Sequence, residues 1–300
     1  MLARLQKFAT FSLLAFVLAW LGYFLARGAF AWATVGPAIV VVGYAGVLAL
    51  EFCLLYRSYP QGAPHRPRFG QLARACVSEA AVAPCVFLWR QPFRSKSIPD
   101  APEARASPPR RGVVFVHGFV CNRGLWNPWL LRMDQEGVPF VAVTLEPVFG
   151  SIDLYVDAVE EAVDRLSSAA GRVPVIVAHS MGGLAVRAWL ARTHRVSRFH
   201  RVVTIATPHH GTQMARHSHT ANGRQMRFES PWLNQLARAE SKEVYARFTC
   251  YWSPCDNIVF PTASATLPGA DNRCLEATPH VRMAYHPAVV DEVLQLTLQE

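Results

Sequence analysis

The sequence contains few charged residues and few cysteines. Asp, Glu, Lys and Arg make up 17% of its 300 residues, against about 25% in an average soluble domain, whereas hydrophobic residues make up 51%. This composition excludes an intrinsically disordered chain, and the positive mean hydropathy of +0.15 points toward a membrane. Seven cysteines are too few for a disulfide-stabilised scaffold, and the odd number leaves at least one thiol free.

Negative charge is scarce in the N-terminal third of the chain. Residues 1–111 contain 13 Lys and Arg but only 4 Asp and Glu, whereas residues 112–300 contain 17 of each kind. The net charge of +9 therefore belongs to the first region, and the second region is neutral. Because a nucleic-acid-binding domain carries basic residues on its folded part, we expect no nucleic-acid partner.

Two long apolar runs predict a transmembrane helical hairpin. Residues 8–26 contain no charged residue and reach about 28 Å as a helix, close to the thickness of the hydrocarbon core. A second run covers residues 29–55, and its only charged residue is Glu51. Ala29-Phe30-Ala31 resembles a signal-peptide cleavage site, but the first run is long for a signal peptide and the second follows at once. We therefore expect two spans, at about 8–26 and 29–55, in a membrane region of residues 1–56.

Positive charges flank the outer ends of this hairpin. They are Arg4 and Lys7 before the first run, and Arg57, Arg66, Arg68 and Arg74 after the second. Only Arg27 lies at the turn. The positive-inside rule then places both ends in the cytoplasm. The expected location is the inner membrane, with the remainder of the chain on the cytoplasmic side.

Residues 57–111 are expected to connect the hairpin to a separate domain. Between residues 71 and 89, apolar and small residues alternate with Arg74 and Glu79. This pattern fits a helix on the membrane surface or a helix packed against the next domain, and the sequence does not decide between them. Residues 95–111 are rich in Pro, Ser and charge and predict a linker, so a domain boundary near residue 111 is expected.

Strands and helices alternate from residue 112 to residue 300. Short β-branched or aromatic runs predict strands at residues 113–116, 141–145, 173–178, 201–206, 248–253 and about 273–276. Apolar residues at helical spacing predict helices at 152–170 and 287–298. This alternation predicts an α/β domain over residues 112–300, with a mainly parallel sheet flanked by helices.

The third predicted strand leads directly into Ala178-His179-Ser180-Met181-Gly182-Gly183. A serine on a sharp strand-to-helix turn needs small residues two positions before and two after it, and Ala178 and Gly182 supply them. Such a turn holds the Ser180 hydroxyl clear of the sheet and directs the N–H of Met181 to the place where an oxyanion forms. A serine that merely caps the helix is the alternative. The strand–turn–helix context favours Ser180 as a nucleophile.

These motifs resemble the α/β-hydrolase superfamily, most closely its small bacterial lipases and esterases. Val113–Phe119 (VVFVHGF) is similar to the family's strand and oxyanion loop, and His179–Gly183 to its nucleophile elbow. Thr207–Thr212 (TPHHGT) is similar to a segment that these lipases carry after the sixth strand. Ala178 stands where most members have Gly, although some small bacterial lipases also have Ala. The resemblance implies an α/β-hydrolase fold without a cofactor, and the membrane hairpin is not part of the family pattern.

The resemblance also implies roles for individual residues. Ser180 would be the nucleophile, and Phe119 and Met181 would donate backbone N–H groups to the oxyanion. Gly118 would let the loop approach the substrate, and His117 would brace that loop without a catalytic role. Two further supporting positions lie in the elbow, namely His179 and Gly182.

The acid and the base follow the nucleophile along the chain in this family. For the acid, Asp256 follows a predicted strand and is favoured over Asp271, which more closely fits a turn cap. For the base, His280 lies in a loop after the last predicted strand. His286 directly precedes Pro287 and fits the start of the final helix, so His280 is favoured.

Four histidines in or near the TPHHGT segment raise the question of a metal site. They are His209, His210, His217 and His219, but no Cys or carboxylate lies nearby at ligand spacing and no H-E-x-x-H is present. We expect no metal, and we interpret residues 212–230 as a polar cap over the site. In the cytoplasm, the cysteines of the catalytic region are expected to be thiols. These are Cys121, Cys250, Cys255 and Cys274.

The sequence thus predicts a membrane-anchored serine hydrolase that cleaves acyl or lipid esters through a Ser180–Asp256–His280 triad. Its expected partners are the ester substrate and the lipid bilayer. Acyl transfer or thioester hydrolysis with the same triad is one alternative. A non-catalytic binding module with a hydrolase fold is another, although the presence of all triad candidates argues against it.

Overall fold

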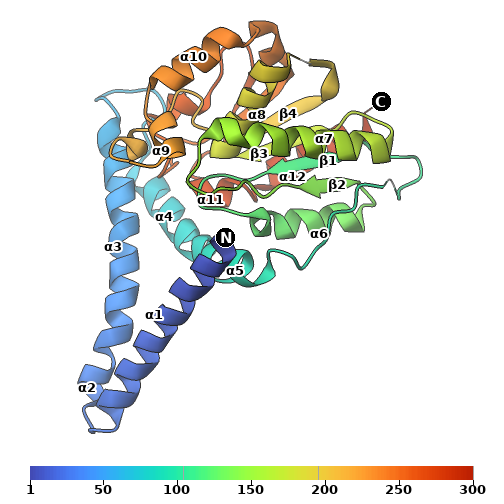
Figure 1. Ribbon diagram of the computed structural model, residues 1–300. Coiled ribbons are helices and arrows are strands. Elements are labelled where there is room, and N and C mark those ends of the chain that lie inside the picture. Colours follow the sequence, from blue (N-terminus) through green and yellow to red (C-terminus); the bar gives the residue numbers. More distant parts are fainter. Residues whose placement is uncertain (104, 195, 300) are drawn as a thin grey trace.

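The computed structural model describes residues 1–103, 105–194 and 196–299. Ala104, in the expected linker, lies outside the described residues, as do Arg195 and Glu300 in the expected 112–300 domain. Two long helices diverge from a shared tip, and a layered unit of strands and helices lies at their open end (Figure 1). We call this unit, residues 112–299, the α/β region.

The α/β region is built on a six-stranded sheet in which every pair of neighbours is parallel, in the order β2-β1-β3-β4-β5-β6. The strands are β1 (Val113–Val116), β2 (Phe140–Ala142), β3 (Val175–His179), β4 (Arg201–Ile205), β5 (Phe248–Trp252) and β6 (Asp271–Cys274). The parallel sheet predicted from the sequence is confirmed. The four residues of β1 are all buried, because helices cover both faces of a sheet of this kind.

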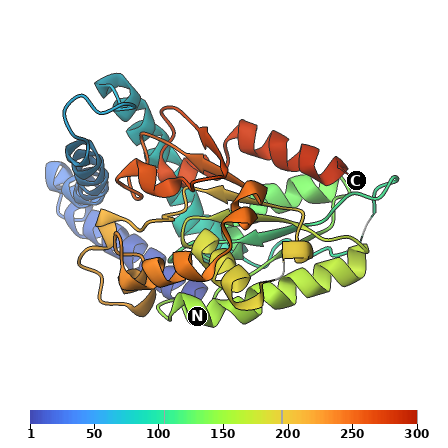
Figure 2. The ribbon, with the colours of Figure 1, turned by 90° about the horizontal axis from the view of Figure 1, so that it is seen from above.

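Successive side chains of β1 enter two different cores. Val114 and Val116 pack with the helices on one face, and Val113 and Phe115 with those on the other. The first face carries α7 (Val156–Ala170) and α8 (Met181–Thr193), and the second carries α6 (Asn127–Gln135) and α12 (Pro287–Leu298). Figure 2 shows this sandwich from above, with α7 and α12 on opposite sides of the strands. The shorter helices α9 (Ala221–Gln225), α10 (Pro231–Ala239) and α11 (His280–Met283) border the sheet.

Two edge strands differ in their bounds from the predicted ones. The second strand was predicted at residues 141–145 but ends at Ala142. After Ala142, Val143 N still donates to Phe115 O. The chain then leaves β1, and Leu145 N donates to the side chain of His117 at Nε2. The last strand was predicted near 273–276 but is Asp271–Cys274, and its residues are exposed. An edge strand pairs with one neighbour only, and that pairing decides where the strand ends. The bounds of its hydrophobic run therefore predict the ends of the strand poorly.

The N-terminal region forms the two long helices that diverge from a shared tip, like the arms of a V, in Figure 1. They are α1 (Leu2–Leu25) and, after a short α2 (Phe30–Ala33), α3 (Val35–Ser58). Near the tip, Trp20 Nε1 donates to Trp32 O at 2.8 Å. Within the part of the chain that the structure describes, three helical stretches are long and apolar enough to cross a membrane, namely Leu2–Leu25, Phe30–Ser58 and Phe69–Arg94. The first two correspond to the predicted hairpin, and the third was not predicted as a span.

This third stretch consists of α4 (Phe69–Pro84), a π-helical turn (Cys85–Arg90) and α5 (Gln91–Arg94). α4 packs against α11 and against the end of α3. Of the two interpretations that the sequence left open, the structure favours a helix packed on the next domain. The segment after it, predicted as a linker at 95–111, is also held to the α/β region, because Asp100 pairs with Arg123 at 2.6 Å.

Candidate active site

The candidate residues meet where the strand order reverses. β1 is followed in the chain by its neighbour on one side, β2, whereas β3 is followed by β4 on the other side. In open α/β sheets, ligands bind in the crevice outside the carboxyl ends of strands at such a reversal. Gly118 and Phe119 come after the end of β1, and Ser180 comes directly after the end of β3. The predicted oxyanion loop and nucleophile thus lie at the same crevice.

Ser180 has a strained backbone conformation, with φ 54° and ψ −129°. This conformation is rare for a residue with a side chain, and such residues cluster at functional sites. The turn is held by Ser180 N, which donates to Ile205 O at 2.8 Å. It also depends on glycine, because a Cβ on Gly182 would lie 2.5 Å from Val116 O. A Cβ on Gly118 would lie 2.7 Å from Ser180 Cβ, so the two loops are in contact.

Gly182→Ala is expected to destabilise the protein by about 1–3 kcal/mol, because the new methyl group would be forced into the carbonyl oxygens of Val116 and His117. The obstructing atoms are backbone oxygens and cannot rotate away. Thermal unfolding of the full-length protein measures the effect. Gly70→Ala is the matched control, because nothing lies within 4 Å of a Cβ at that helix position. Equal melting temperatures for the two variants would contradict this account of the turn.

Two backbone N–H groups beside Ser180 are available to a ligand. Among the described residues, neither Phe119 N–H nor Met181 N–H donates a hydrogen bond within the protein. Free donors at such a turn form the cradle that an oxyanion requires. His117 braces the same loop, since its Nδ1 contacts Gly118 O at 2.9 Å and its Nε2 accepts from Leu145 N at 2.9 Å. Burial lowers the pKa of His117 to about 4, so this imidazole is neutral at physiological pH.

Asp256 and His280 form a hydrogen-bonded pair. His280 Nδ1 lies 2.9 Å from Asp256 Oδ1 and 3.1 Å from Oδ2, and both side chains are buried. The carboxylate is also held by its own loop, because Oδ1 accepts from the N–H groups of Ile258 and Val259 at 2.9 Å each. Among the described residues, no hydrogen bond joins Ser180 Oγ to His280. Such bonds are often formed only when substrate is bound.

His179 connects the turn at Ser180 to the His280 loop. Its Nε2 lies 3.1 Å from His280 O, and the two imidazole rings are 4.8 Å apart. Burial, followed by the neighbouring His280, lowers the pKa of His179 to about 3, which makes it a neutral hydrogen-bond donor. Burial would also lower the pKa of His280. The attraction of Asp256, together with Glu79 and Glu51, outweighs burial and raises that pKa above its ordinary value of 6.5.

The competing candidates lie in other surroundings. Asp271 is exposed and pairs with Arg273 at 2.7 Å, and His286 accepts from Ala288 N at 3.3 Å as the cap of α12. His209 is buried, with Nε2 3.1 Å from Thr204 Oγ1. In the part of the chain that the structure describes, no three His, Cys, Asp or Glu side chains gather as a metal ion would require. All seven cysteines are free thiols.

Three residues that sequence reasoning missed surround Asp256 and His280. Asn257 Oδ1 accepts from His280 N at 3.2 Å, and Glu51 Oε2 accepts from Asn257 Nδ2 at 2.6 Å. Glu79 accepts from the two N–H groups that follow His280. The sequence already marked the two carboxylates as unusual, because Glu51 and Glu79 are the only acidic residues before Asp100. An ionisable residue within a long apolar helix is commonly functional.

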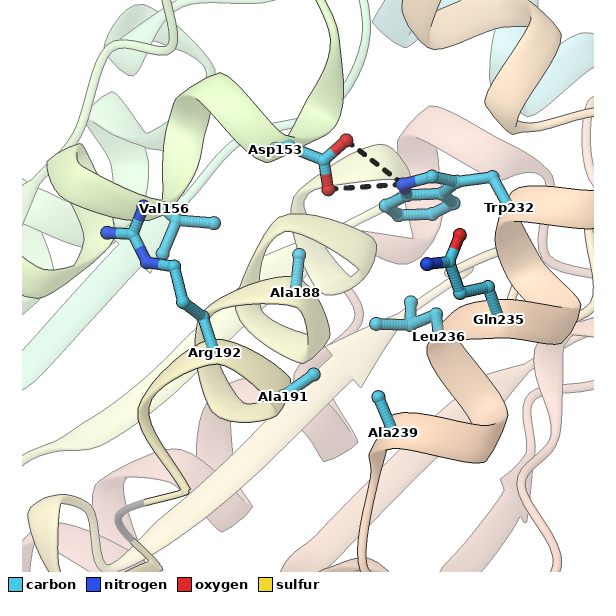
Figure 3. Close-up of a pocket in the computed structure, with 9 residues that line it drawn as sticks. All are labelled: Asp153, Val156, Ala188, Ala191, Arg192, Trp232, Gln235, Leu236 and Ala239. Carbon is cyan, nitrogen blue, oxygen red and sulfur yellow. Dashed lines mark hydrogen bonds between the residues drawn. The ribbon is translucent and has the colours of Figure 1, made fainter.

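A groove of about 400 Å³ lies elsewhere, between α8 and α10 (Figure 3). Small residues of α8, Ala188 and Ala191, form one wall, and Trp232 and Leu236 of α10 form the other. The Trp232 indole nitrogen donates to Asp153 at 3.1 Å. Ser180, Asp256 and His280 do not line this groove, so it is not the site at which they would act.

Comparisons with known proteins agree with this fold. Lipase BlEst2 of Bacillus licheniformis, in its mature form, is similar with a TM-score of 0.57 and 16% sequence identity, over 65% of this chain and 95% of its own. Lipase B of Aspergillus fumigatus is similar with a TM-score of 0.53 and 17% identity, over 60% of this chain and 51% of its own. Identities this low establish likeness of fold alone, and no curated protein sequence matches. A sequence model described as the alpha/beta hydrolase family matches residues 113–293, more than half of the chain, and the protein therefore belongs to that family.

Proposed function

We propose that the protein is a membrane-anchored serine hydrolase that cleaves carboxylic esters through an acyl-enzyme. Ser180 is the nucleophile, His280 the general base and Asp256 the acid that orients it. The observation that carries the proposal is the 2.9 Å hydrogen bond between His280 Nδ1 and Asp256 Oδ1, at the strand edge where Ser180 lies in its strained turn. The chain order Ser, Asp, His is also that of the family.

The reaction follows from these positions. His280 Nε2 takes the proton of Ser180 Oγ as this oxygen attacks the ester carbonyl, and Phe119 N–H and Met181 N–H stabilise the resulting oxyanion. The C–O bond to the alcohol then breaks, and His280 returns the proton to the leaving oxygen. In the second half, His280 deprotonates a water molecule as this attacks the acyl carbonyl; the bond to Ser180 Oγ then breaks, and His280 returns the proton to Oγ as the carboxylic acid leaves. Asp256 accepts from Nδ1–H throughout and keeps Nε2 facing the serine.

The N-terminal helices support a location at a lipid bilayer, and so a lipid-like ester as substrate. α1 contacts α5 where Phe11 meets Phe93, and α3 contacts the α/β region from Glu51 onward. Leu48 of α3 is already buried, so the arms beyond these contacts are residues 12–25 and 35–47, which reach only about 20 Å, less than the hydrocarbon core of about 30 Å. Full insertion of these arms would therefore bring the loop that contacts α3, which includes Cys255 and Asn257 on either side of Asp256, close to the membrane surface.

Labelling and turnover together test the proposed function. The full-length protein, in detergent micelles or reconstituted vesicles, is treated with a fluorophosphonate and assayed with p-nitrophenyl esters of increasing acyl length. We expect covalent modification of the peptide that contains Ser180, loss of ester hydrolysis in proportion, and a preference for longer acyl chains. Modification of another residue, or hydrolysis that persists in the fully modified protein, would contradict the assignment.

The pH dependence of hydrolysis is expected to follow His280. Only the neutral imidazole can accept the Ser180 proton, so kcat/KM should fall as the pH drops through the pKa of His280. Since Asp256 raises this pKa above 6.5 against the effect of burial, the midpoint of the ascending limb is expected above pH 6.5. Initial rates with a neutral ester between pH 5 and 9 measure it. A limb centred well below pH 6 would be incompatible with a base held by a carboxylate.

A further inference from the structure

The two isolated carboxylates of the N-terminal helices reach one place in the α/β region. Glu51 lies on α3 and Glu79 on α4, and no other Asp or Glu precedes Asp100. Glu79 is 2% exposed. Burying a carboxylate in an apolar helix costs free energy unless its oxygens are hydrogen-bonded. The hydrogen-bond partners of these two groups therefore indicate their role.

Glu79 binds the backbone that carries the proposed base. Its Oε1 accepts from Val281 N at 2.9 Å and its Oε2 from Arg282 N at 3.2 Å. These are the two N–H groups directly after His280, in the only turn of α11, where backbone donors have no acceptor of their own. A side chain that lies 202 residues before Val281 in the chain thus fixes the turn from which the imidazole extends.

Glu51 reaches the backbone of His280 indirectly, through the side chain of Asn257. Its Oε2 accepts from Asn257 Nδ2 at 2.6 Å, and Asn257 Oδ1 accepts from His280 N at 3.2 Å. Asn257 is also the neighbour of Asp256 in the chain. The three consecutive N–H groups of residues 280–282 are therefore held by side chains that belong to, or are fixed by, the N-terminal helices.

The same carboxyl groups also determine the charge around the His280 imidazole. The groups that face His280 are the carboxyl groups of Asp256, Glu79 and Glu51 and the neutral imidazole of His179, whereas Arg282, on α11 itself, is exposed. Burial raises the pKa of Glu79 to about 7, so above that pH its negative charge, together with that of Glu51, stabilises the imidazolium form that the reaction produces.

We propose that Glu79, supported by Glu51, is a positioning residue for His280, so that the N-terminal helices are a working part of the active site as well as an anchor. This inference rests on the proposed hydrolase function. It requires that ester hydrolysis depend on two carboxylates that do not touch the substrate. It also requires that their removal change the proton affinity of the base.

The test compares Glu79→Gln and Glu51→Gln with the wild type, all as full-length protein. At position 79 an amide leaves one backbone N–H without an acceptor, and we expect kcat to fall about 10- to 100-fold with little change in KM, as for a small misplacement of a catalytic group. At position 51 the glutamine oxygen can still accept from Asn257, so charge alone is lost and kcat should fall less. In both variants the ascending limb of the pH profile should move to lower pH, because the imidazolium loses a stabilising charge.

Glu160→Gln is the matched control. This carboxylate is also partly buried and pairs with Arg198 at 3.3 Å, away from His280, so its loss should leave the pH limb in place. If Glu79→Gln fails to fold, Glu51→Gln carries the test alone. An unmoved limb in the folded variants, with or without loss of kcat, would overturn the inference, because loss of stability alone does not change the pKa of the base. If the wild type itself hydrolyses no ester, the proposed function fails instead.

Discussion

Ser180→Ala is expected to lower kcat/KM for p-nitrophenyl esters by about 10⁴-fold or more, while the protein keeps its fold. The change removes the attacking oxygen but leaves the N–H groups of Phe119 and Met181 in place, so a residual rate above that of water should remain. The fold should tolerate the variant because alanine at φ 54° is strained to the same degree as serine, and among the described residues the Ser180 side chain makes no hydrogen bond. Steady-state hydrolysis and thermal unfolding measure the two quantities.

Ser168→Ala is the control for this experiment. Ser168 is exposed on α7, on a helix that covers one face of the sheet, and its loss should change neither hydrolysis nor the melting temperature. If Ser180→Ala retains activity while Ser168→Ala behaves like the wild type, the nucleophile lies elsewhere. If both proteins and the wild type are folded and inactive, the non-catalytic binding module becomes the better explanation.

The parts of the site that the sequence could predict are those set by local structure. The turn at Ser180 needs a strand that ends at His179, a glycine at position 182 and a helix that starts at Met181, and all three lie within a few residues. The bounds of β1 and of α12 were predicted for the same reason, since a buried run or a Pro at a helix start is a local signal. Asp256 was chosen because it follows a predicted strand and because the resemblance to the family places the acid there, after the nucleophile in the chain.

The parts that the sequence could not predict are contacts between distant segments. Glu79 and Val281 are 202 residues apart, and nothing in the pattern of either segment specifies the partner. The apolar face of α4 fits a membrane surface as well as a protein surface, because both bury the same side chains. Only the fold shows that Ala75 of α4 packs in one cluster with Phe52 of α3 and with Cys255, which directly precedes Asp256.

Asp256→Asn is expected to lower kcat by about 10⁴-fold, and the reason lies in the tautomer of His280. Asparagine can present its amide hydrogens to His280 Nδ1, which would then accept and leave the ring proton on Nε2, facing Ser180. An imidazole in this form cannot take the serine proton. The loop itself should remain intact, because the asparagine oxygen can still accept from the N–H groups of Ile258 and Val259.

Asp271→Asn separates this effect from the loss of any carboxylate. Asp271 is exposed and its partner Arg273 also pairs with Glu292, so this variant should hydrolyse esters within about twofold of the wild type. The same kcat measurement on both variants decides between the two candidate acids. A large loss in Asp271→Asn with none in Asp256→Asn would reverse the assignment. Losses of equal size would mean that neither carboxylate orients the base, because only one of them lies within hydrogen-bond distance of His280.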